Sequence, residues 1–419
     1  MNPGAIAVHV VELARDGRFR EAEALFAKRL RKVVSAQSFQ SGWSVQLAVI
    51  GAVTSIGQPE TGPGEPGLTR VRVPVDGESG AIDVFMSVDD KGKLHGLRLA
   101  AATPTDWQPP SYADQNSFTE QEITLGTGQD AVPGTLTLPR GPGPFPGVVL
   151  LPGGGPFDRD ETSGVNKPLK DVAWGLASRG VATARFDLIS CVRPDLAAAP
   201  GFTMSQEYVP HAVAAAHLLQ DQSTVDSSRV FVLGHSMGGR VAPRVAAADD
   251  AIAGMVLLAA DASPMPRAAA RVARYVASAS PGFIPDTVVD GVERQVALIE
   301  GPDLSPTTPA SELPYSWPGS YWLEIRDDDP AGTAAMLGRP MFIAQGARDY
   351  QVTVADDLTR WQAVLGDRDN VTIKVYEADD HMFFPGEGPS TPAGYEPPQH
   401  VDPVLIADVA LWLTAAAQR

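Results

Sequence analysis

Ser236 is the residue of this chain whose surroundings most strongly indicate chemistry. It lies in the segment VFVLGHSMGGRV, residues 230–241, where apolar residues pass through small ones into a helix-forming stretch. Gly234, Ser236 and Gly238 form the pattern G-x-S-x-G, which between a strand and a helix is typical of a nucleophile elbow. The glycines allow close approach of the backbone. We expect the hydroxyl to lie at the carboxyl edge of a sheet, where the next helix presents free N–H groups to developing negative charge.

A serine nucleophile needs a base to remove its proton, and the base needs a third group to orient it. After an elbow of this kind, the order along the chain is serine, acid, histidine. Asp349 follows the apolar run RPMFIAQ, and His381 follows VTIKVYEADD, so both come just after predicted strands. We therefore predict a catalytic triad of Ser236, Asp349 and His381. Asp379 and Asp380 are rival acids, ranked lower because they adjoin the histidine and do not arrive from a neighbouring strand.

The segment VVLLPGGGPFDRDE places a glycine loop directly after a predicted strand. Acyl transfer needs N–H donors for the tetrahedral oxyanion. One donor follows the nucleophile, and the other comes from a loop in this position. We predict Met237 and Gly154 as the donors of an oxyanion hole, with Gly155 as the alternative to Gly154. A phosphate-binding interpretation is disfavoured, because neither a G-K-[ST] ending nor a G-x-G-x-x-G pattern accompanies these glycines.

Alternating strands and helices must position these residues. Buried parallel strands are typically short continuous apolar runs. The predicted strands are 148–151, 181–186, 230–233, 253–259, 341–345 and 372–377, and the predicted helices are 171–178, 208–220, 239–248, 356–364 and 403–416. A strand pair, EITLG and GTLTLP, precedes them. The pattern predicts an α/β class domain over residues 118–419, with a doubly wound, mostly parallel sheet that starts with two antiparallel strands.

Residues 261–338 do not fit this alternation. The stretches RAAARVARYVASAS and VVDGVERQVALIEG predict two helices, and ELPYSWPGSYWLEI predicts an aromatic loop. Ligands of such sheets bind at the carboxyl ends of the strands, where this insertion emerges. We interpret it as a cap over the site. The alternative is a peripheral helical elaboration without substrate contact.

The first part of the chain has a different pattern. Apolar residues at helical spacing over 6–34 predict two helices broken near Asp16 and Gly17. Segments 43–56, 68–76, 80–90 and 94–101 then predict strands, with DGESG as a hairpin turn. We predict a small α+β domain over residues 1–102. Residues 103–117, rich in proline and polar residues, predict a linker.

Composition excludes several classes of partner. The formal charge of −17 disfavours nucleic acids and anionic membrane surfaces. We also expect no membrane-spanning segment, and the N-terminus lacks the features of a secretory signal, so we expect a cytoplasmic protein. The single cysteine, Cys191, forms no intrachain disulfide, and we expect it to be buried. We predict no cofactor and no metal, because His211, His217 and His235 lack carboxylates at ligand spacing.

The motifs resemble the α/β-hydrolase superfamily, and more narrowly its dienelactone-hydrolase and acyl-peptidase-like serine esterases. RVFVLGHSMGGRVAP, QGARDYQV, DDHMFF and GGGPFDRDE carry the resemblance, over most of residues 118–419. Relatives commonly have HGSGP where this chain has Pro152 and Gly154, so side-chain contacts near the oxyanion differ. Some relatives are similar in carrying an N-terminal cystatin-like or nuclear-transport-factor-like domain. The resemblance implies hydrolysis of a carboxylic ester, or acyl transfer, through an acyl-enzyme.

The sequence leaves several functions open. We favour a serine esterase with a small-molecule ester or acyl substrate. An acyltransferase, thioesterase or cyclase of specialised metabolism would use the same triad, and the alanine- and arginine-rich composition, which indicates a high-GC bacterium, keeps that option. A peptidase has less support. A binding protein that has lost its chemistry is the alternative from another class. For the N-terminal domain we favour an interaction or homodimerisation module over a wall of the pocket.

Overall fold

The computed structural model describes residues 2–64, 67–102, 107–280 and 284–415. The chain divides into two compact units, Met1–Thr105 and Asp106–Arg419. Each unit has its own apolar core, one core in the first unit and two in the second.

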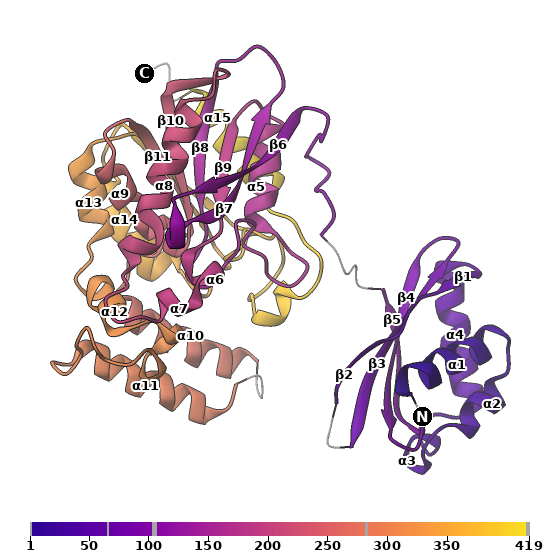
Figure 1. Cartoon of the computed structure of the whole chain (residues 1–419). Helices are drawn as coiled ribbons and strands as arrows, with labels where there is room; N and C mark the ends of the chain where they lie inside the picture. Colours follow the sequence, from indigo (N-terminus) through magenta and orange to yellow (C-terminus); the bar gives the residue numbers. More distant parts are fainter. Residues whose placement is uncertain (1, 65–66, 103–106, 281–283, 416–419) are drawn as a thin grey trace. The chain divides into compact units, whose positions relative to one another are not determined.

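In the first unit, helices precede strands along the chain. The helices are α1 (Pro3–Arg15), α2 (Phe19–Ala24), α3 (Lys28–Arg31) and α4 (Ala36–Ile50), and the strands are β1 (Val53–Ile56), β2 (Glu60–Pro63), β3 (Leu68–Gly77), β4 (Ala81–Asp89) and β5 (Leu94–Ala101). The antiparallel sheet has the order β1-β3-β4-β5, and β2 also pairs with β3. Val71, Val73 and Val75 of β3 are buried on the face that the helices cover (Figure 1). The predicted hairpin between β3 and β4 is confirmed.

The prediction of a strand over residues 43–56 is wrong for most of its length. Helix α4 continues to Ile50, and only Val53–Ile56 is a strand. Phe39, Trp43 and Ile50 recur at helical spacing and lie in the core of the first unit. Burial of this face outweighs the strand preference of the valines between them. A glycine in the left-handed region, Gly51 with φ of 79°, then ends the helix.

The second unit is built around a mostly parallel sheet. Within its described residues, eight strands form one sheet in the order β13-β12-β11-β10-β8-β9-β7-β6. They are β6 (Phe118–Leu125), β7 (Val132–Pro139), β8 (Phe145–Leu151), β9 (Ala182–Phe186), β10 (Val225–His235), β11 (Ile252–Leu258), β12 (Met341–Gly346) and β13 (Val371–Tyr376). Strand β7 is antiparallel to β6 and β9, and the other pairs are parallel. The predicted mostly parallel sheet with an antiparallel start is confirmed.

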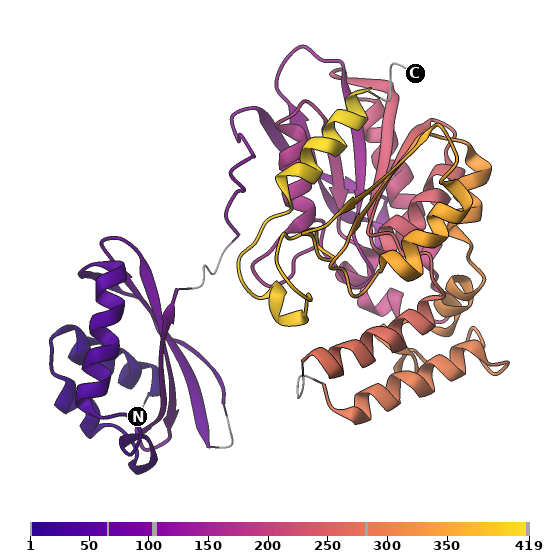
Figure 2. The ribbon, with the colours of Figure 1, turned by 180° about the vertical axis from the view of Figure 1, so that it is seen from behind.

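Helices cover both faces of this sheet. Helices α5 (Pro168–Ala177) and α15 (Pro403–Ala415) share one core with the sheet, and Figure 2 shows α15 lying across that face. Helices α8 (Met204–Gln220), α9 (Met237–Ala248) and α14 (Thr359–Leu365) share the other core. The predicted helix over 356–364 begins as a π-helical segment, Val354–Leu358, before α14.

The predicted linker lies partly outside the described residues, since 103–106 are not described. Trp107, which follows, packs on α5: its Nε1 donates to Oδ1 of Asp171 at 2.8 Å, and its ring meets Trp174 edge-on at 4.9 Å. A buried carboxylate and an aromatic contact therefore anchor Trp107 within the second unit.

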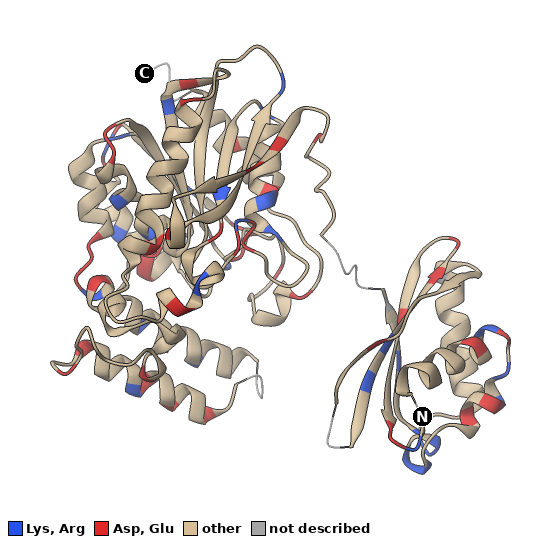
Figure 3. Ribbon diagram, viewed as in Figure 1, with Lys and Arg blue, Asp and Glu red and all other residues tan. Residues whose placement is uncertain are grey.

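The insertion after β11 contains more helix than the sequence predicts. Helices α10 (Met265–Ala279) and α11 (Asp286–Glu300) confirm the two predicted helices. The charged residues of α10 are all arginines, whereas those of α11 are mostly acidic (Figure 3). The aromatic segment, predicted as a loop, continues into α12 (Gly319–Arg326), and α13 (Pro330–Leu337) packs against α9. Tyr321 and Trp322 are buried, and their packing stabilises α12 although aromatic residues have only a modest intrinsic preference for helix.

Candidate active site

Ser236 occupies a sharp turn between β10 and α9. Its φ of 52° and ψ of −119° lie in a region that residues with side chains rarely adopt. An ideal Cβ on Gly234 would lie 2.1 Å from the carbonyl oxygen of Gly238, and one on Gly238 would lie 2.4 Å from that of Leu151. A side chain at either position would clash with the backbone, so both positions of the motif require glycine. Ser236 is itself partly exposed, so a molecule in solution can reach it.

Asp349 follows β12, and His381 follows β13. Both strands run in the same direction as β10, so they end at the same edge of the sheet. Oδ2 of Asp349 lies 2.7 Å from Nδ1 of His381, and both side chains are buried. Backbone N–H groups of Gln351 and Val352 donate to Oδ1 of Asp349, and Nε2 of Gln345 donates to Oδ2. A carboxylate held by this many donors keeps one orientation. It therefore fixes the imidazole with Nδ1 toward the acid.

The imidazole of His381 lies beside the turn that carries Ser236. The ring centroids of His381 and His235, the residue before Ser236, are 4.8 Å apart. Nε2 of His235 donates to the backbone oxygen of His381 at 2.8 Å. The structure thus brings together three segments that are widely separated along the chain.

The two rival acids have other surroundings. Oδ1 of Asp380 accepts hydrogen bonds from the N–H groups of Met382 and Phe384 and so stabilises the turn after the histidine. Neither carboxylate oxygen of Asp379 has a partner among the described residues. Burial, followed by the charges of Asp402 and Asp380, raises the pKa of Asp379 to about 8. Asp349 is thus the acid that contacts the imidazole.

The glycine loop after β8 lies against the elbow. An ideal Cβ on Gly153 would lie 3.3 Å from Cβ of Ser236, and one on Gly154 would lie 3.2 Å from Cβ of Met237. Met237 is the first residue of α9, where N–H groups have no acceptor within the helix. The N–H of Gly153 donates to Oε1 of Glu161 at 2.7 Å. Gly154 and Met237 are therefore neighbours, as two donors to one oxygen must be.

Two residues that the sequence analysis assigned no role hold this loop. Tyr208 on α8 donates its hydroxyl hydrogen to the carbonyl oxygen of Gly153 at 2.9 Å. Gly155, with φ of 141°, accepts hydrogen bonds on its carbonyl oxygen from Oγ of Ser190 at 3.3 Å and from the N–H of Phe157 at 2.8 Å. No local motif marks Tyr208 or Ser190, since both act through contacts between distant segments.

An aromatic side chain of the insertion lies over the glycine loop. The far edge of the Trp317 ring is 3.0 Å from an ideal Cβ on Gly154, and only 4% of Trp317 is exposed. Trp317 stacks on Tyr321 with ring centroids 4.5 Å apart, and the Tyr321 hydroxyl donates to Oε2 of Glu207 on α8 at 2.6 Å. The aromatic segment of the insertion thus packs against the glycine loop at Gly154.

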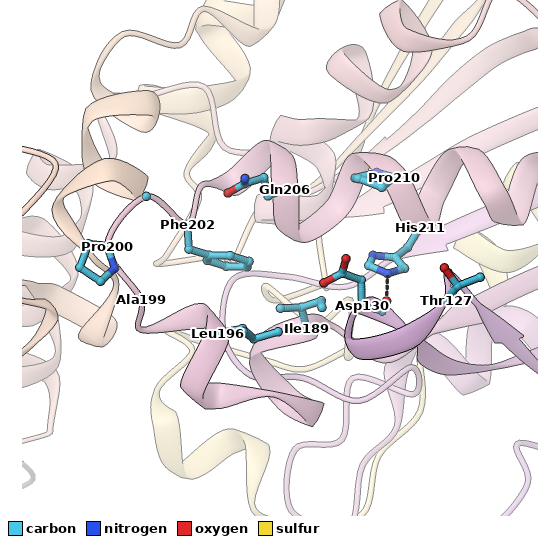
Figure 4. A pocket seen from close by; sticks show the side chains of 12 residues that line it. Thr127, Asp130, Ile189, Leu196, Ala199, Pro200, Phe202, Gln206, Pro210 and His211 are labelled. Atoms are coloured by element: carbon cyan, nitrogen blue, oxygen red, sulfur yellow. Dashed lines mark hydrogen bonds between the residues drawn. The ribbon is translucent and has the colours of Figure 1, made fainter.

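A separate cavity of about 590 Å³ lies between the β6–β7 turn, the short helices α6 (Ile189–Val192) and α7 (Pro194–Ala197), and α8 (Figure 4). Leu196, Phe202 and His211 are among its lining residues, and none of the three predicted catalytic residues is. Nε2 of His211 donates to the backbone oxygen of Asp130 at 2.7 Å, which gives this histidine a structural partner.

Among the described residues, no group of three or more His, Cys, Asp and Glu side chains is arranged to hold a metal ion. Likewise, no helix within the described ranges combines the length and the apolar character needed to span a bilayer. The prediction that Cys191 is buried is wrong. It is exposed on α6, whose buried side carries Ile189 and Ser190.

Comparison with known proteins identifies the family. Residues 148–395 match the model of the alpha/beta hydrolase family. The chain belongs to this family. This alpha/beta hydrolase is 35% identical to Esterase EstD of Thermotoga maritima over 339 residues, which is 80% of the chain and 77% of EstD. That length exceeds the second unit, so the similarity reaches into the first. The chain also matches the solved structure of Est1E from Butyrivibrio proteoclasticus, with 14% identity, a TM-score of 0.46, and coverage of 71% of this chain and 99% of Est1E.

Proposed function

We propose that this alpha/beta hydrolase is a serine esterase that cleaves carboxylic esters through an acyl-enzyme. Family membership, together with 35% identity to an esterase over most of both chains, supports ester hydrolysis as the overall reaction. The likeness to EstD supports water as the final acceptor of the acyl group, in preference to a second substrate.

In the first half of the reaction, Oγ of Ser236 attacks the ester carbonyl carbon and His381 takes the hydroxyl proton. The tetrahedral intermediate collapses, the C–O bond to the leaving group breaks, and His381 gives its proton to the departing alkoxide. Water then attacks the acyl-enzyme, again losing a proton to His381. The carboxylic acid leaves when Ser236 recovers its proton.

The hydrogen bond between Asp349 and His381 is the observation that carries this proposal. A buried carboxylate on Nδ1 holds a hydrogen on that nitrogen, so Nε2 is the nitrogen with a lone pair for the serine proton. The same carboxylate stabilises the imidazolium that forms during the reaction. Asp349 thus has the role of the orienting acid.

The oxyanion is assigned to the backbone N–H groups of Met237 and Gly154, with Gly155 as the alternative donor. The approach of Gly154 to Met237 supports this pair. Donors fixed by a helix N-terminus and a braced loop need no reorganisation as charge develops on the substrate oxygen. Trp317, which lies over Gly154, would limit the access of water to the oxyanion.

The test is covalent labelling of Ser236. Ser236→Ala should abolish both hydrolysis of short p-nitrophenyl esters and labelling by a fluorophosphonate, measured by intact mass. Ser228→Ala is the matched control, because Ser228 is an exposed serine on the same strand. It should label at the wild-type rate. If Ser236→Ala is labelled at the wild-type rate, Ser236 is not the nucleophile.

For the first unit we propose an interaction or homodimerisation role. Its helices followed by an antiparallel sheet support the comparison with cystatin-like or nuclear-transport-factor-like domains. The subgroup of dienelactone-hydrolase and acyl-peptidase-like esterases remains our proposal for the second unit, and it rests on the glycine loop and the elbow.

A further inference from the structure

Glu161 and His235 form a second buried acid–histidine pair at the same sheet edge as Asp349 and His381. Oε1 of Glu161 lies 2.8 Å from Nδ1 of His235. Only 1% of Glu161 and 4% of His235 is exposed. Groups this polar are buried at a large cost in free energy unless their contacts compensate for it.

The pair connects the three loops that carry the proposed reacting groups. Oε1 of Glu161 also accepts the N–H of Gly153 in the glycine loop, at 2.7 Å. On the other side of the imidazole, Nε2 of His235 donates to the carbonyl oxygen of His381 at 2.8 Å. His235 directly precedes Ser236. A continuous chain of hydrogen bonds therefore runs from the oxyanion loop, past the nucleophile, to the loop of the base.

Hydrogen-bond chemistry indicates where the protons of this pair reside. A carbonyl oxygen can only accept, so Nε2 of His235 carries a hydrogen. Oε1 of Glu161 accepts from the N–H of Gly153 and also faces Nδ1 of His235, so a hydrogen bond between the acid and the imidazole requires one further proton between these two atoms. Burial lowers the pKa of His235, but the charge of Glu161 and its hydrogen bond outweigh burial and leave the pKa raised.

Glu161 also holds a costly conformation. Its φ of 55° lies in the left-handed region, and its Oε2 is buried without a partner among the described residues. Each feature opposes folding, and strained residues of this kind persist only where the surroundings hold them in place. Stability alone does not account for a buried glutamate in such a conformation.

We propose that Glu161 and His235 are positioning residues that set the distance between the oxyanion donors, Ser236 and His381. This inference rests on the proposed function, and neither residue touches the reacting atoms. A misplacement of about 1 Å in such a site costs about 100-fold in rate. Because the spacing of these groups matters most in the transition state, losing the pair should lower kcat more than it changes KM.

Glu161→Gln keeps the shape and an acceptor for Gly153 but removes the charge that holds the His235 proton. We expect kcat for p-nitrophenyl acetate to fall about 10- to 100-fold, with KM within about twofold of wild type. The rate of fluorophosphonate labelling should fall by a similar factor. Active sites are counted by the amplitude of the p-nitrophenol burst, so unfolded molecules do not contribute.

Asp171→Asn is the matched control. Asp171 is also a buried carboxylate, with Oδ2 3.0 Å from Nδ1 of His400 and 3.1 Å from the N–H of Val401. It lies on α5, away from the elbow. This variant should lower the thermal midpoint and leave kcat unchanged. Comparison of the two variants separates positioning from a general loss of stability.

A double-variant cycle tests whether the pair acts as a unit. If so, Glu161→Gln with His235→Gln should lose about as much rate as the larger single loss, whereas independent losses multiply. A kcat of Glu161→Gln within twofold of wild type, or multiplied losses in the double variant, would overturn the proposal. If Glu161→Gln does not fold, His235→Gln decides by the same kcat criterion. These outcomes are distinct from the test of the proposed function, which is decided by whether Ser236→Ala is still labelled.

Discussion

The buried carboxyl groups near His381 differ in their hydrogen-bond partners, and this difference sets their roles. Asp349 accepts from several donors and from the imidazole, and Asp380 accepts from two backbone N–H groups. Asp379 has no partner for either oxygen among the described residues. The sequence DDH thus contains two adjacent acids whose chemistry is set by where each side chain points.

Asp379 makes stability depend on pH. Its pKa is raised to about 8 in the folded protein by burial and by Asp402 and Asp380, against an ordinary value of 3.8. Between these values the folded state holds a proton that the unfolded state has released, so the free energy of unfolding falls as pH rises. When the pH rises from 5 to 8, the free energy of unfolding of wild type should therefore fall by about 2–4 kcal/mol more than that of Asp379→Asn.

Urea unfolding of both proteins at the two pH values measures this difference. Asp367→Asn, which changes an exposed aspartate, serves as the control and should show the pH dependence of wild type. Equal pH dependence of Asp379→Asn and wild type would contradict the assignment of a proton to Asp379.

Helix α9 directly follows the proposed nucleophile, Ser236, and also anchors the insertion. Arg240, only 2% exposed, forms ion pairs with Asp261 at the start of the insertion and with Asp328 near its end. Burial raises the pKa of Asp261 to about 6 although Arg240 lowers it, so the cation is needed to keep this carboxylate ionised at neutral pH. One side chain therefore ties both ends of the predicted cap to the helix that begins at the elbow.

Arg240→Met should cost about 3–5 kcal/mol of unfolding free energy, because it leaves buried carboxylates without their main cation. Arg267→Met is the comparison, since the pair of Arg267 with Glu300 on α10 and α11 is largely exposed and contributes about 1 kcal/mol or less. Chemical denaturation at pH 7 measures both values. Similar losses of unfolding free energy in the two variants would show that the buried ion pairs of Arg240 stabilise the protein no more than an exposed pair does.

At the scale of the whole molecule, the proposed site belongs to one unit. Gly154, Ser236, Asp349 and His381 all lie within Asp106–Arg419, which has its own apolar cores. The first unit has a separate core. A unit with its own core folds independently as a rule, so chemistry and any self-association can be assigned to different parts of the chain.

A chain of residues 106–419 should fold and retain kcat for p-nitrophenyl acetate within about threefold of the full chain. If the first unit drives dimerisation, light scattering should give a dimer mass for the full chain and a monomer mass for the shortened one. A folded shortened chain that has lost most of its kcat would instead place part of the site in the first unit.

The sequence alone predicted the fold class and most strands of the second unit, and it indicated Ser236, Asp349 and His381 as residues that follow three of these strands. These features are readable because each depends on local pattern: apolar runs of strand length, glycines around a serine, and the order of serine, acid and histidine. The strand predicted over residues 43–56 failed where local preference for strand opposed the burial of Phe39, Trp43 and Ile50 on one helical face.

Only the tertiary structure decided which groups support the site. Glu161 and His235 are 74 residues apart, and His235 and His381 are 146 apart, so no periodicity links them. Arg240 reads as an ordinary helical residue until its ion pairs with the insertion are seen. A hydrogen bond or an ion pair depends on distances of a few ångströms between segments, and those distances arise only when the sheet brings its loops to one edge.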